Sequence, residues 1–197
     1  MSFLTFVAEL EPLDGPEDRS GEIAAAKAGD LAAFEQLMRR HERLVLVTAL
    51  RLLGSLADAQ DASQEVFLKL YRSLAKVEAQ GNISGWLYRV TVNACHDLRR
   101  RRPAAAVPME DAGELASGEA DPQEQTAELE RRRVLRMSLR TLSEKERAAL
   151  VLRDLEGLST GEVARVLGSS EATVRSQICK ARVKVKDFVE RYFRRHV

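Results

Sequence analysis

The residues with the clearest chemistry lie between 160 and 176, where the spacing is that of a helix-turn-helix. Ala164 is small enough for two helices to cross closely, and Gly168 can adopt the left-handed conformation that ends the first helix. The pattern places Val163, Leu167 and Val174 in the core beneath the crossing. The second helix then presents polar and basic side chains of the kind that contact a DNA major groove. The alternative is a helical hairpin packed only for stability.

The outer face of that second helix supplies hydrogen-bond donors and positive charge. Side chains in its first turns are candidates for contacts with base edges, and we expect the basic side chains further along to contact backbone phosphates. The residues are Thr173, Arg175, Ser176, Lys180, Arg182 and Lys184. Glu171, near the helix start, can accept a hydrogen bond from cytosine, but a favourable interaction with the helix dipole is the simpler interpretation.

Charge is segregated along the chain, although the net charge is only +1. The balance is −5 over residues 1–30, +5 over 31–102, −8 over 103–130 and +9 over 131–197. Each basic block is a candidate surface for a polyanion, because neutralising phosphates releases counterions. The alternative for each block is a solvated charged helix face.

Length and composition limit the class of protein. A chain of 197 residues forms one or two small domains. No apolar run is long enough to span a bilayer, and the first ten residues lack a basic leader and a cleavage site. Cys95 and Cys179 have no neighbouring metal-ligand partners. We therefore expect a cytoplasmic protein with no membrane insertion, no metal and no cofactor.

Hydrophobic periodicity of three and four residues predicts an all-α fold. Helices are predicted over 30–53, from Asp58 onward, and from Ser84 to Arg101, with 76–84 as a loop. The second of these would bury Phe67, Leu70, Tyr71 and Leu74. Helical pattern resumes near residue 122, a capping box of Ser143 and Glu146 opens the next helix, and a final helix begins near 171.

Four units follow from these patterns. They are an acidic N-terminal tail over 1–22, a helical domain over 23–102, a flexible acidic linker over 103–128 and a helical domain over 129–197. The tail can mask basic surfaces or serve only as a polar extension, and its composition favours the second interpretation.

Several segments, in this order, resemble the extracytoplasmic-function group of bacterial sigma factors, within the sigma-70 family. They are residues 27–34, 58–67, 86–102, 142–147 and the helix-turn-helix. Together they cover residues 23–102 and 129–192. A helix-turn-helix alone is shared by many regulators, so the specificity lies in its combination with the acidic segment at 58–67 and the Trp-Leu-Tyr-Arg segment that begins at Trp86.

The resemblance implies that region 2, in the first domain, binds a coiled coil of the beta-prime subunit of RNA polymerase. The matching positions are Asp58, Asp61, Gln64, Glu65 and Leu68. Exposed carboxylates on an amphipathic helix suit a basic helical partner. The alternative is that Asp58 and Asp61 only cap the helix and compensate its dipole.

The resemblance also implies that the loop 76–84 traps a flipped base of the −10 element. The pocket would be built by Val77, Gln80, Asn82 and Ile83, with Arg89, Asn93, His96, Arg99 and Arg100 on the following helix. Family members often carry an aromatic residue where Val77 stands, so the preferred base can differ here. Trp86 is a core plug or a stacking platform, and the arginine run can simply solubilise the helix end.

For region 4 the resemblance implies contacts with the −35 element by the helix face described above, and phosphate or polymerase contacts by Arg147 and Arg153. The family commonly has basic residues near Gln177 and Cys179, so the element read here can differ. The linker would approach the RNA path of polymerase or act only as a tether. The implied protein is no enzyme. It binds core RNA polymerase through the beta-prime and beta subunits, selects and melts promoter DNA, and has an anti-sigma factor as a further partner.

Two other classes of protein compete with this interpretation. A stand-alone helix-turn-helix regulator explains the last third of the chain but gives 58–67 and 86–102 no role. A small helical hydrolase or nuclease would need partners for His41, His96 or His196 that the sequence does not supply.

Overall fold

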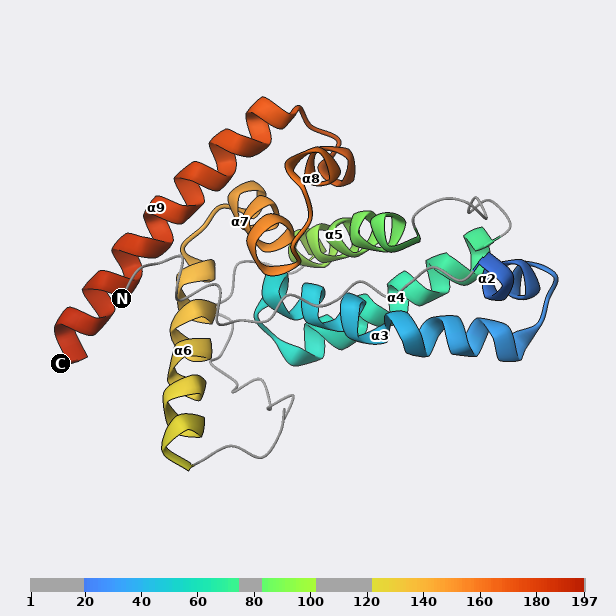
Figure 1. Ribbon diagram of the computed structural model, residues 1–197, viewed down its shortest axis with the longest axis horizontal. Coiled ribbons are helices and arrows are strands. Elements are labelled where there is room, and N and C mark those ends of the chain that lie inside the picture. The colour runs from blue at the N-terminus through green and yellow to red at the C-terminus, as the bar shows by residue number, and fades with distance from the viewer. Residues whose placement is uncertain (1–19, 75–82, 102–121, 197) are drawn as a thin grey trace.

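A computed structural model describes residues 20–74, 83–101 and 122–196 (Figure 1). The described residues are helical and contain no strand, which confirms the all-α prediction. The elements are α2 (Ser20–Lys27), α3 (Leu31–Leu53), α4 (Leu56–Ser73), α5 (Ile83–Arg101), α6 (Pro122–Arg140), α7 (Glu144–Leu150), the π-helical turn η2 (Val151–Leu155), α8 (Thr160–Leu167) and α9 (Glu171–His196). None of these helices is both long and apolar enough to cross a membrane.

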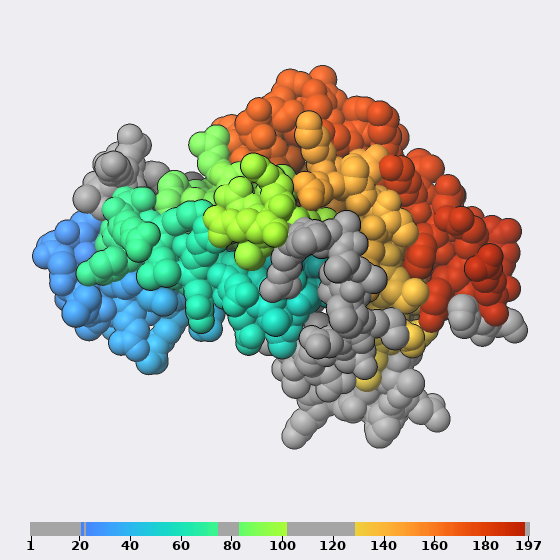
Figure 2. Space-filling view, turned by 180° about the vertical axis from the view of Figure 1, so that it is seen from behind, coloured from blue at the N-terminus to red at the C-terminus, as the bar shows by residue number. Residues whose placement is uncertain are grey.

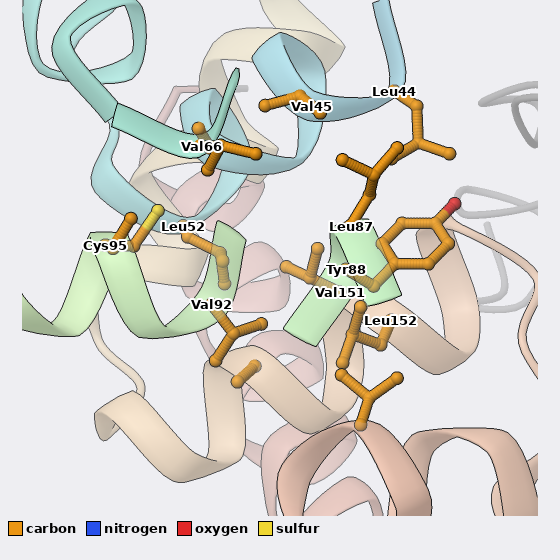
Figure 3. Close-up of a cluster of buried hydrophobic side chains, with 14 of the residues drawn as sticks. Leu44, Val45, Leu52, Val66, Leu87, Tyr88, Val92, Cys95, Val151 and Leu152 are labelled. Atoms are coloured by element: carbon orange, nitrogen blue, oxygen red, sulfur yellow. The ribbon is translucent and has the colours of Figure 1, made fainter. Parts of the chain in front are cut away.

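The first unit, α2–α5, is organised around the long helix α3. Asp30 caps α3 by accepting hydrogen bonds from the backbone N–H groups of Ala32 and Ala33, at 2.9 and 3.2 Å. Gly54 ends the helix in the left-handed region, with φ of 74°, as its position in the sequence predicted. The inner faces of α3, α4 and α5 meet in one apolar layer that includes Val45, Val66 and Leu87 (Figure 3).

Helix α4 differs from the prediction in two respects. It begins at Leu56 rather than Asp58, because the Ser55 hydroxyl caps it by accepting from the Asp58 N–H. Tyr71 was predicted to be buried, and this is wrong, since its side chain is 56% exposed. The buried stripe passes through Val66 and Leu70, and one further residue turns the helix by about 100°, which moves Tyr71 onto the outer face.

The second unit, α6–α9, contains the helix-turn-helix as predicted. Val163 and Val174 are fully buried, and Ala164 is 7% exposed at the crossing. Gly168 ends α8 with φ of 59° and ψ of 39°. The predicted capping box of Ser143 and Glu146 is present at α7, and Ser159 with Glu162 forms a second one at α8.

The two units pack directly against each other, an arrangement that the sequence did not predict. Val151 and Leu152 of η2 lie in the same buried cluster as Leu52, Tyr88 and Val92 of the first unit (Figure 3). Helix α8 contacts α5, and η2 contacts α3. Seen from behind, the atoms of the second unit lie against those of α5 without a gap (Figure 2).

Candidate nucleic-acid and protein interfaces

An open groove of about 560 Å³ lies between α3 and α4 on the first unit. Its floor is apolar and includes Phe34, Met38, Phe67 and Leu68. Tyr71 also lines the groove, and its ring meets that of Phe34 edge-on with the ring centres 5.2 Å apart. An apolar groove with exposed large side chains on a helical surface suits the apolar face of a partner helix.

The residues predicted to bind a protein partner differ in how far their side chains are exposed to solvent. Gln64 and Leu68 line the groove, and Leu68 is 55% exposed. Asp61 is exposed on the same helix, and Glu65 forms an ion pair with Lys69 at 2.7 Å. Asp58 is buried, 7% exposed, in the first turn of α4. That position favours the helix-start interpretation for Asp58, because a carboxylate there interacts with the helix dipole.

Sequence reasoning missed the α3 side of the groove. Phe34 and Met38 lie one turn apart and are only partly buried, packed against the edge of the core. Their spacing signals an apolar helix face, but it does not distinguish a core position from the wall of a groove.

The predicted DNA-contacting residues of α5 follow one side of that helix. Arg89, Asn93 and Arg100 are exposed, and His96 is half-buried. Arg99 instead turns toward α3, where its Nη2 donates to the Leu52 carbonyl at 3.1 Å. Their spacing places the exposed members on a stripe that can follow a nucleic-acid backbone.

The predicted base pocket is only partly within the described residues. Val77, Gln80 and Asn82 lie outside them. Ile83, the first residue of α5, is fully buried, so as placed its side chain fills the core and does not line an accessible pocket. Trp86 packs partly buried against the core, which supports the core-plug interpretation.

The outer face of α9 is open over its first turns. Thr173, Arg175, Ser176 and Lys180 are all exposed. The Ser170 hydroxyl accepts from the Thr173 N–H at 3.2 Å, and Arg175 Nη1 lies 3.1 Å from a Glu171 carboxylate oxygen. Glu171 therefore orients the Arg175 side chain, a contact that sequence reasoning did not propose.

Two of the basic residues further along α9, Arg182 and Lys184, pair with carboxylates of the second unit. Arg182 donates to both carboxylate oxygens of Asp154, at 2.8 and 2.6 Å, and this pairing raises the pKa of the guanidinium. Lys184 Nζ lies 2.8 Å from both oxygens of Glu146. These bonds, with those from Ser143, hold the pKa of Glu146 below its ordinary value. Both cations pair with neighbouring carboxylates, so they are less available to phosphates than Lys180.

Arg147 was expected to contact phosphate or polymerase, and the structure gives it a different position. Its side chain is buried, 5% exposed. Nε donates to the Leu139 carbonyl at 2.7 Å, Nη1 to the Leu52 carbonyl at 2.9 Å and Nη2 to the Leu142 carbonyl at 3.0 Å. Arg147 thus donates to carbonyls near the end of α3, in the last turn of α6 and just beyond α6, where helix ends need donors from outside.

Comparison of the sequence with known proteins gives consistent matches over both units. Residues 37–104 match the family model for Sigma-70 region 2, and residues 132–185 match that for Sigma-70, region 4. The ECF RNA polymerase sigma factor SigM of Mycobacterium tuberculosis is 36% identical over 164 residues, covering 83% of this chain and 80% of SigM. The ECF RNA polymerase sigma-E factor of Escherichia coli is 31% identical over 182 residues, covering 88% of this chain and 95% of that protein.

Solved structures share the fold. The structure of CnrH in complex with the cytosolic domain of CnrY matches with a TM-score of 0.66 and 27% identity, over 88% of this chain and 98% of that chain. The sigma factor RpoE in complex with the anti-sigma factor NepR from Bartonella quintana matches with a TM-score of 0.62 and 21% identity, over 80% and 96% of the two chains.

Proposed function

Because this chain belongs to the extracytoplasmic-function group of RNA polymerase sigma factors, we propose that it binds core polymerase through its first unit, directs it to promoters and helps to open the −10 region. The observation that carries the proposal is the open face of α9, where Thr173, Arg175 and Lys180 are exposed in a confirmed helix-turn-helix. The chain itself catalyses no step in this proposal. It positions polymerase on DNA.

The α3–α4 groove is the surface that we assign to polymerase. Leu68 and Tyr71 expose apolar area, and Gln64 offers both a donor and an acceptor at the edge of the groove. A helix of the beta-prime subunit would place apolar side chains on this floor and basic side chains near Asp61. The beta subunit would meet the second unit.

DNA would be read by two surfaces of different character. On α9, Arg175 can donate two hydrogen bonds to a guanine of the −35 element, a contact that discriminates by about 1–3 kcal/mol. On α5, the stripe of Arg89, Asn93 and Arg100 suits the backbone of a separated −10 strand. Each surface is weak alone, and joining both through polymerase raises their effective concentration.

Control by an anti-sigma factor completes the proposal. RpoE, which shares the fold, was solved with an anti-sigma factor bound. In this chain the groove is the exposed apolar surface that such a partner would cover, and polymerase would then be excluded by direct competition.

Transcription in vitro with purified core polymerase over a promoter library tests the proposal. Addition of the chain should yield transcripts that share −35 and −10 sequences, and the chain should copurify with core polymerase. Leu68→Glu should abolish both, whereas Gln60→Ala, on the same helix and also exposed but not lining the groove, should change neither. A chain that never joins polymerase, or joins it and initiates on no template, would refute the proposal.

A further inference from the structure

The first side chain of the recognition helix contacts both helices of the helix-turn-helix. Glu171 opens α9 directly after the turn, and α8 packs beside α9 (Figure 1). Its Oε2 lies 3.1 Å from Arg175 Nη1, one turn further along α9. Its Oε1 lies against Gly161, the second residue of α8, so closely that a Cβ added there would be 3.3 Å away. The carboxylate is therefore held between the start of α8 and the Arg175 side chain.

Gly161 leaves the space that this carboxylate occupies. Its φ lies outside the left-handed region, so the backbone does not require glycine at this position. Glycine inside a helix lowers stability relative to alanine. Apart from its chain neighbours and the backbone of α8, the only atoms of the described structure within 4 Å of an added Cβ are Oε1 and Cδ of Glu171. The start of a helix is also a favourable place for a negative charge.

Stability does not explain the pair of Glu171 and Arg175. The two side chains are 54% and 63% exposed, and exposed ion pairs contribute little to folding. The pair does restrict the guanidinium, which otherwise has the rotamer freedom of a long side chain. Within the described residues Arg175 makes no further hydrogen bond or ion pair, so its Nε and Nη2 can donate to the O6 and N7 atoms of a guanine.

The carboxylate also affects how Arg175 interacts with phosphates. A freely moving cation on a DNA-binding face contacts phosphates of any sequence, which adds affinity without discrimination. Glu171 offsets the charge of Arg175 and repels phosphates at the same place. Arg175 should therefore add less to binding of all sequences and more to the choice of one base.

We propose that Glu171, in the space left by Gly161, is a positioning residue that sets the base preference of Arg175. It holds the guanidinium for one guanine of the −35 element and keeps it from neighbouring phosphates, and it contacts no base itself. The inference rests on the proposed function for the identity of the α9 face, and it names residues that act behind the one that reads the base.

Selection from a library of random duplexes by the full-length chain tests this role. Wild type should prefer guanine at one position by about five- to 150-fold, the range expected for a bidentate contact. Glu171→Ala should lower that preference by about three- to tenfold. It should also steepen the slope of log K against log salt by about one, because the released cation contacts a phosphate.

Two further variants at carboxylates separate position from charge. Glu171→Gln keeps an acceptor for Arg175, so it should retain more of the guanine preference than Glu171→Ala while steepening the salt slope equally. Glu190→Ala is the matched control. Glu190 forms exposed ion pairs with Lys186 and Arg194 on the same helix, about 28 Å from Glu171 along the axis, and its loss should leave the base preference unchanged.

Gly161→Ala tests the space behind the carboxylate. The added methyl group should displace Oε1 by a few tenths of an ångström and lower the guanine preference by about two- to threefold. The midpoint of thermal unfolding should stay unchanged or rise by up to about 3 °C, because alanine favours the helix. Gly21→Ala on α2, where an added Cβ meets no atom within 4 Å, is the control and should not change the base preference.

The outcomes are decided by the base preferences. Equal guanine preference in wild type, Glu171→Ala and Gly161→Ala would overturn the inference. In an Arg175→Ala background, Glu171→Ala should change the preference at no position, and a change there would mean that Glu171 reads a base directly. Transcription with core polymerase tests the proposed function separately. A chain that shows these duplex preferences but starts no transcript would refute that function and leave this inference standing.

Discussion

Replacing Arg147 with methionine tests how far one buried guanidinium stabilises the fold. The side chain makes three hydrogen bonds of 3.0 Å or shorter, to the carbonyls of Leu139, Leu52 and Leu142. Methionine keeps most of the volume but removes this donor. The Leu52 carbonyl still accepts from Arg99 and the Leu139 carbonyl from the Leu142 N–H, so the largest loss falls on the Leu142 carbonyl. Each unmade buried bond costs about 1–3 kcal/mol, partly offset because methionine is less costly to bury than a charge. We expect the free energy of unfolding to fall by about 2–4 kcal/mol.

Urea and thermal denaturation followed by circular dichroism measure this change. For a chain of this size, a loss of that order lowers the melting midpoint by about 10 °C. Arg153→Met is the control, since Arg153 lies on η2, which directly follows α7, and is only half-buried, and it should lower the free energy of unfolding by less than about 1 kcal/mol. If the two variants unfold at the same urea concentration, Arg147 is not the stabilising centre that its contacts indicate.

Three other perturbations have definite expected outcomes. Gly168→Ala should lower the free energy of unfolding, measured by denaturation, by about 1–2 kcal/mol, and Gly168→Asn should lower it by less. The cost arises from the left-handed φ of 59°, because a Cβ added at Gly168 meets no atom within 4 Å. Arg175→Ala should relax promoter sequence choice in a selection assay, whereas Lys180→Ala should weaken binding to every sequence and flatten the slope of log K against log salt by about one; equal effects would contradict the assignment. The folded-state pKa of Glu146 is depressed by Lys184 and Ser143, so its stabilisation is present above the ordinary pKa of a glutamate side chain and is lost as pH falls through the folded value. The difference in free energy of unfolding between wild type and Glu146→Gln should therefore shrink in acid. A difference that grows in acid would show that the pKa of Glu146 is not depressed in the folded state.

The features that the sequence predicts well are local. Asp30, Gly54, Ser143 and Gly168 cap or end helices as predicted, because the interactions involve groups within a few residues of each other. The helix-turn-helix is also local, since the spacing of Ala164, Gly168 and Val174 fixes which side chains meet. The open face of α9 then follows from helical periodicity alone.

Features set by distant segments could not be predicted in this way. Glu156 and its donor Thr48 are 108 positions apart, and nothing in the pattern around either residue distinguishes an enclosed carboxylate from a solvated one. Arg182 and Lys184 lie in a run of basic residues, and the sequence of this run does not distinguish a phosphate partner from a carboxylate partner. Only the packing of α9 against α7 and η2 reveals Glu146 and Asp154 as their partners.

The contact between the units combines the buried apolar cluster around Val151 and Leu152 with buried polar groups around Glu156. Well-packed apolar residues often stabilise a buried position at least as well as an ion pair does, so stability alone does not require Arg51 and Glu156. A polar pair differs in what happens on separation: both charges regain hydration, and the newly exposed surface is less prone to associate with other proteins. Stability alone therefore does not account for the enclosed carboxylate of Glu156.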